Sequence, residues 1–100
     1  MAFTQIVEVD GVSDEQALHQ LMVDWDSAQS GVAPGYLGCR VLADQDAPGR
    51  YLVEVDFSSE EEAKRNNDRP ETEAWADNLR KLAQGTPTYR NLGQVCSTYG

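Results

Sequence analysis

Amide and aromatic side chains in the second half of the chain could contact a small molecule. Asn66 and Asn67 could orient a substrate oxygen, and Trp75 could flank an aromatic ligand. Each has an ordinary structural alternative, because Asn breaks and caps helices and a Trp on an amphipathic helix more often packs in the core. We take Asn67 and Trp75 as the candidate catalytic residues and leave the structural alternatives open.

Two tyrosines and a second tryptophan could line a pocket for the same kind of ligand. Tyr36 and Tyr51 each lie at the start of a predicted strand, where a ring can pack in the core while its hydroxyl reaches a pocket. Trp25 follows Leu21 and Met22 at helical spacing, which favours packing. These three aromatic residues are candidate substrate-binding groups, with core packing as the alternative.

Arg40 is the candidate anion-binding residue, because it is a basic side chain in an otherwise apolar stretch. An ion pair with Glu54 or Asp56 on a neighbouring strand is the alternative. His19 could act as a general base near neutral pH. Its position beside the apolar helix stripe instead predicts an exposed residue.

The two cysteines give no sign of a metal site. Cys39 and Cys96 belong to no CxxC pair, and the single histidine cannot complete a Cys/His zinc set. In a cytosolic chain we expect two free and mostly buried thiols. We therefore expect no metal site, and no residue pattern calls for a cofactor.

The charge balance excludes some partner classes. The chain has 100 residues and a formal net charge of −9, which argues against binding to nucleic acid or anionic lipid. The first 30 residues contain six of the acidic residues and no Lys or Arg. No apolar run approaches a membrane span, and the first residues do not resemble a signal peptide. We expect one cytoplasmic domain over residues 1–100.

Alternating apolar residues and turn residues predict four strands and two helical regions. A capping box of Ser13 and Gln16 begins a helix that runs to about Gln29. The second helical region starts at Ser58 or Ser59, breaks at residues 66–68 and resumes with Asp68 as the cap and Pro70 in the first turn. The predicted strands are residues 3–10, 36–43, 50–57 and 89–96.

This order of elements predicts an α+β, ferredoxin-like βαββαβ fold with a four-stranded antiparallel sheet. The expected strand order is 4-1-3-2, with both helical regions on one face. Ile6, Leu52 and apolar residues of the second strand would lie on the other face. Because that face is more apolar than a solvated one needs to be, we expect a homodimer in which two sheets pack together.

Three stretches carry a resemblance to a known group of proteins. They are RYLVEVDFSSEEEA at residues 50–63, NNDRPETEAWADNL at residues 66–79 and GTPTYRNL at residues 85–92. With the element order, they make the chain similar to the dimeric α+β barrel superfamily. Within it, the chain resembles small actinobacterial-type proteins related to antibiotic-biosynthesis monooxygenases.

The resemblance implies a homodimer with a pocket between sheet and helices in each subunit. It further implies a cofactor-independent monooxygenase for a small aromatic, polyketide-like substrate, in which pocket side chains assist deprotonation and the substrate carbanion reacts with oxygen. Asn67 matches the helix break where relatives carry a pocket His or Asn. Haem-degrading relatives are less similar, because residues 59–85 contain no His.

Two other functions stay open. The chain lacks a committed acid/base pair, metal set or activated nucleophile, so it could be a non-catalytic accessory protein or a small-ligand-binding homodimer. An isomerase or lyase acting on a small carboxylic acid ranks last, because Arg40 and Arg90 are its few candidate basic groups.

Overall fold

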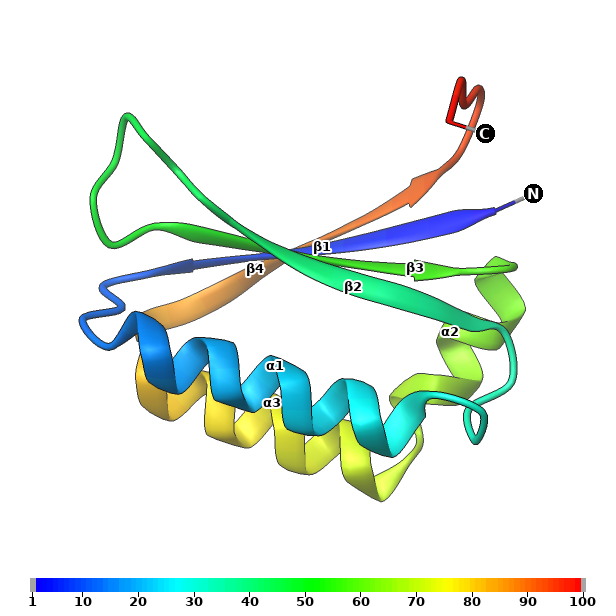
Figure 1. The fold of residues 1–100 in the computed structure, drawn as a ribbon, viewed down its shortest axis with the longest axis horizontal. Helices are drawn as coiled ribbons and strands as arrows, with labels where there is room; N and C mark the ends of the chain where they lie inside the picture. The colour runs from blue at the N-terminus through cyan, green and yellow to red at the C-terminus, as the bar shows by residue number, and fades with distance from the viewer. Residues whose placement is uncertain (1, 100) are drawn as a thin grey trace.

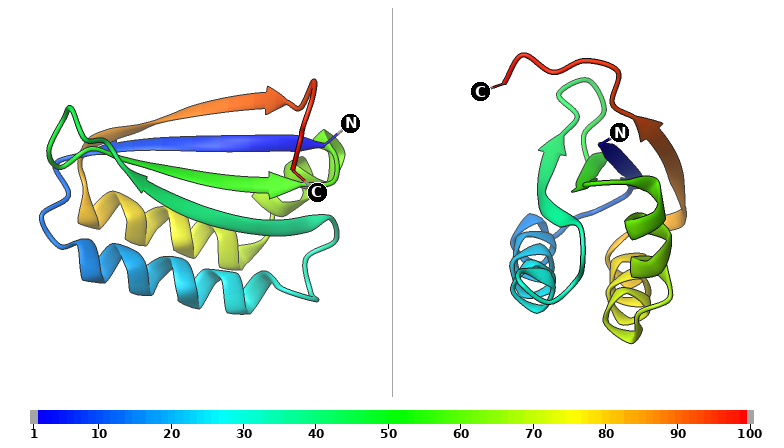
Figure 2. Two further views of the ribbon diagram at one scale, coloured as in Figure 1. Left: turned by 45° about the horizontal axis from the view of Figure 1, so that its top comes forward. Right: turned by 90° about the vertical axis from the view of Figure 1, so that its right-hand side faces the viewer.

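The computed structural model describes residues 2–99 and has the predicted ferredoxin-like arrangement (Figure 1). A four-stranded antiparallel sheet with the order β2-β3-β1-β4 is covered on one face by the helices (Figure 2). The strands are β1 (Phe3–Asp10), β2 (Tyr36–Ala43), β3 (Tyr51–Phe57) and β4 (Gln84–Gly93). The helices are α1 (Glu15–Gln29), α2 (Glu60–Asn67) and α3 (Pro70–Leu82). Both the fold class and the strand order predicted from the sequence are confirmed.

The core lies between the sheet and the helices. Alternation along β1 and β3 directs every second side chain to the helical side, where Phe3 pairs with Phe57 and Val7 with Val53. The helices bury the complementary apolar stripe. The largest helical contributors are Leu18, Met22, Trp25, Trp75 and Leu79.

The helix starts follow the sequence signals with one correction. Helix α1 is capped by the Asp14 carboxylate, which accepts from the Ala17 amide at 3.0 Å, so the expected Ser13 cap is wrong by one residue. Helix α2 is capped by Ser59 rather than Ser58. The helix breaks after Asn67, and Pro70 begins α3. Arg69 occupies the N-cap position there without a side-chain hydrogen bond, so Asp68 is not the cap.

The last strand lies earlier in the sequence than predicted. It begins at Gln84, where Gln84 pairs with Asp10, and ends at Gly93, where Gly93 pairs with Phe3. A register shift accommodates Pro87, which an edge strand tolerates because the missing N–H is not needed by a neighbouring strand. Cys96 therefore lies beyond the strand. It is exposed, contrary to the expectation of a mostly buried thiol, although both cysteines are free.

None of the helices in residues 2–99 has the length and hydropathy needed to span a bilayer.

Candidate functional site

Two stacked indoles fill the centre of the space between sheet and helices. The rings of Trp25 and Trp75 lie 4.8 Å apart at an interplanar angle of 24°. Both are buried, and the Trp75 indole N–H donates to the Met22 sulfur at 3.2 Å. Trp75 can therefore offer a ligand its ring but not its N–H. Helix α1 lies beneath β2 and α3 lies toward the β4 side (Figure 2), and each borders a separate hollow.

The hollow on the β4 side, which we call the α3 pocket, brings the two candidate catalytic residues together. It has a volume of about 410 Å³ between α3 and strands β1 and β4. The exposed Asn67 amide and the edge of Trp75 both line it. The remaining lining residues are Gln5, Thr72, Glu73, Ala76, Arg80 and Tyr89.

Thr72 is a pocket residue that the sequence reasoning missed. Its side chain is buried, and its hydroxyl has no hydrogen-bond partner among the described residues. An unpaired buried hydroxyl is unfavourable, so a polar group entering the pocket would relieve that cost. The sequence did contain a signal for its place in the pocket: Thr72 lies three residues before Trp75, and this spacing puts both residues on one helix face.

The neighbouring Asn66 has a structural role. It is buried and accepts a hydrogen bond from the Gln29 amide. Gln29 is fully buried and in turn accepts from Arg69 at 2.9 Å. This chain of polar contacts joins the end of α1 to the break between α2 and α3, which holds Asn67 at the pocket rim.

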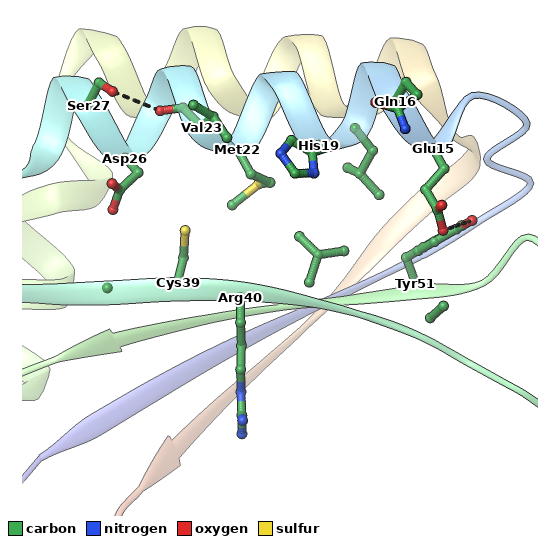
Figure 3. A pocket seen from close by; sticks show the side chains of 14 residues that line it. Glu15, Gln16, His19, Met22, Val23, Asp26, Ser27, Cys39, Arg40 and Tyr51 are labelled. Atoms are coloured by element: carbon green, nitrogen blue, oxygen red, sulfur yellow. Dashed lines mark hydrogen bonds between the residues drawn. The ribbon is translucent and has the colours of Figure 1, made fainter.

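The larger hollow, which we call the α1 groove, lies between α1 and β2 and has a volume of about 600 Å³. Figure 3 shows the side chains of Glu15, Met22 and Asp26 directed from α1 toward the sheet. Tyr51 lines the groove and donates to Glu15 at 3.1 Å, which raises the pKa of the phenol. His19 also borders the groove and is exposed, as predicted.

The Tyr36 ring packs between Trp25 of α1 and Phe57 of β3, outside the lining of either hollow. Its ring meets Trp25 edge-on at 5.5 Å, and its hydroxyl donates to Asp26. Burial and then this hydrogen bond raise the Tyr36 pKa well above its ordinary value. Burial likewise raises the pKa of the Cys39 thiol. Both groups stay protonated near neutral pH, so neither acts there as a base or a thiolate nucleophile.

The structure separates Arg40 from the other candidate binding residues. Its backbone borders the α1 groove, but its side chain points away from the helices (Figure 3). On that opposite face it pairs with Glu54 at 3.0 Å, the alternative given by the sequence. The four candidate substrate-binding residues therefore do not converge: Tyr51 borders the α1 groove, Trp25 and Tyr36 pack in the interior, and the Arg40 side chain lies across the sheet.

In residues 2–99, His, Cys, Asp and Glu side chains nowhere gather in a group of three or more that could hold a metal ion.

Comparison with known proteins reveals similarity in structure. No protein-family model and no curated protein sequence matches the chain. A candidate antibiotic biosynthesis monooxygenase from Caulobacter crescentus matches with a TM-score of 0.79 and 15% identity over 94% of this chain and 90% of that one. SnoaB, a cofactor-independent oxygenase from Streptomyces nogalater, matches with a TM-score of 0.78 and 14% identity over 97% and 96% of the two chains.

A second candidate antibiotic biosynthesis monooxygenase, from Deinococcus radiodurans, matches with a TM-score of 0.74 and 19% identity over the full length of both chains. The chain has the fold of these monooxygenase-like proteins. The resemblance found in the sequence is thus confirmed for the fold.

Proposed function

We propose that this protein is a cofactor-independent monooxygenase that oxidises a small aromatic, polyketide-like substrate in the α3 pocket. The shared fold with SnoaB supports the reaction class. The observation that carries the assignment is the unpartnered Thr72 hydroxyl beside Asn67 and Trp75 in one hollow. These groups offer two polar contacts and an aromatic wall to a phenolic ring.

The proposed chemistry needs the pocket to stabilise negative charge on the substrate. Asn67 and Thr72 donate hydrogen bonds to a substrate oxygen, which favours loss of a proton to solvent water from a ring carbon conjugated with that oxygen. The resulting carbanion transfers electrons to oxygen and forms a C–O bond, giving a hydroperoxide after protonation. Loss of water from that hydroperoxide leaves a new carbonyl, so one O₂ is consumed and one water is released.

Oxygen uptake with an anthrone-type substrate tests this proposal, with a chelator present and no flavin added. We expect uptake by the native protein, and a decrease of about 100-fold in kcat/KM for Thr72→Val, the size typical of removing one donor to a developing oxyanion. Asn67→Ala should also lower the rate. Asn78→Ala is the matched control, because Asn78 is an exposed amide on α3 outside the pocket lining.

Equal rates for Thr72→Val and the native protein would overturn these roles, provided that circular dichroism shows both to be folded. No oxygen uptake across a panel of anthrones and quinols would overturn the oxygenase itself.

A non-catalytic small-ligand-binding protein is the second candidate. The Trp25–Trp75 stack favours this function, because the two rings fill the centre of the interior. The Trp75 N–H already donates to the Met22 sulfur, so it is not free to act on a substrate. Ligand binding without oxygen uptake in the same experiment would support this function over the first.

We further propose that the protein is a homodimer joined through the sheet face away from the helices. Leu42 and Leu92 are exposed on that face, at 41% and 44%. Ion pairs lie among these leucines, Arg40 with Glu54 and Arg90 with Glu8. Apolar side chains between paired charges suit a self-complementary interface.

A further inference from the structure

The α1 groove is a second hollow, separate from the α3 pocket and unused by the proposed oxygenase. Its floor is apolar, formed by Leu18, Met22, Cys39 and Val41. Its volume of about 600 Å³ lies within the range of small-molecule sites. An apolar body of small-molecule size therefore fits it.

Two carboxylates mark the ends of the groove. Glu15 lies in the first turn of α1 and Asp26 near its last turn, about 16 Å apart along the helix axis. Each is positioned by a tyrosine: Tyr51 donates to Glu15 and Tyr36 donates to Asp26. A carboxylate has further acceptor capacity after one such bond, so both ends can accept from an ammonium group.

Positive charge is scarce along the same groove. The first 30 residues contain no Lys or Arg. Arg40, whose backbone borders the groove, directs its guanidinium to the other face of the sheet and pairs with Glu54 there (Figure 3). His19 is the remaining basic side chain in the lining. The groove thus presents a negative potential over an apolar floor.

From this combination we propose that the α1 groove binds an elongated organic cation with an apolar body, and that a diamine with one ammonium group at each end binds best. The hydrocarbon chain of the diamine packs on the apolar floor of the groove, while its two ammonium groups contact Glu15 and Asp26. The proposed dimer face is the opposite side of the sheet, so dimerisation leaves the groove open.

Titration calorimetry with three ligands of equal chain length tests the proposal: diaminododecane with an amine at each end, dodecylamine and dodecanoate. We expect the diamine to bind about tenfold more tightly than the monoamine, because its second ammonium group adds one charge-assisted hydrogen bond. Dodecanoate should not bind, because its carboxylate is repelled by Glu15 and Asp26. Asp26→Asn should weaken diamine binding about tenfold, to the level of the monoamine. It keeps an acceptor for the Tyr36 hydroxyl, so the fold is retained.

Asp24→Asn is the matched control, because Asp24 is an exposed carboxylate on α1 outside the groove. This substitution changes the net charge by the same amount as Asp26→Asn. Its affinity for the diamine should equal that of the native protein. Equal binding of dodecanoate, or equal weakening by Asp24→Asn and Asp26→Asn, would overturn the proposal. Glu15→Gln gives a second measurement of the same kind at the other end. None of these outcomes depends on oxygen uptake in the α3 pocket.

Discussion

Several polar residues take their roles from partners that are distant in sequence. Gln29 ends α1 and is fully buried, where Asn66 and Arg69 satisfy both ends of its amide. A lone Gln at the end of an amphipathic helix gives no signal of such burial. Asn66 and Asn67 are adjacent, yet one is buried in this network and the other lines the α3 pocket.

Tyr36 gives a testable pH dependence at this scale. Its pKa is raised in the folded chain, where it faces Asp26 and Cys39, whereas the unfolded phenol ionises near pH 10. Above about pH 10 the unfolded chain has released a proton that the folded chain retains, so the free energy of unfolding falls as pH rises. We expect a shallower fall for Tyr36→Phe, measured by urea denaturation between about pH 8 and pH 11.

Tyr99→Phe is the control for this measurement, because Tyr99 is 86% exposed. If native and Tyr36→Phe proteins lose stability equally steeply, the buried Tyr36 hydroxyl is not the titrating group.

Among the elements, local sequence signals located most boundaries. Hydrophobic alternation gave β1 and β2 at their observed bounds, and β3 began one residue later than expected, at Tyr51. The final strand was misplaced because Gly85 and Pro87 normally interrupt a strand. Pairing with β1 draws these residues into an edge strand, where a register shift accommodates them.

Two adjacent serines, Ser58 and Ser59, are candidates for the N-cap of α2 on sequence alone, and the structure assigns this role to Ser59. The Ser59 hydroxyl accepts from the Glu62 amide at 3.2 Å, so Ser59→Ala should lower the free energy of unfolding by about 1 kcal/mol. Ser58→Ala is the comparison, because Ser58 precedes the cap position, and it should cost less. Chemical denaturation of the two variants checks this. A larger loss for Ser58→Ala would contradict the assigned cap.

At the scale of the whole molecule, one face of the sheet packs on helices and the other is left with leucines and paired charges. If that face is the proposed dimer interface, light scattering should give a mass near twice 11.1 kDa at micromolar concentration. Leu42→Lys should shift the mass toward the monomer, because it places an unpaired charge in an apolar contact.

Val32→Lys is the matched control, because Val32 is 66% exposed and lies outside the sheet between α1 and β2. A native mass near 11.1 kDa, or equal dissociation by both variants, would contradict the proposed interface.

The sequence by itself determined the order of the elements, and with it the fold class and the strand order. Capping residues, helix breakers and alternation act between near neighbours, so they can be read along the chain. Tertiary structure decided which side chains meet: it placed Asn67 with Thr72 and Trp75, and it turned Arg40 away from them. Those relations depend on the register between strands and on how the helices pack across the sheet, which contacts distant in sequence determine.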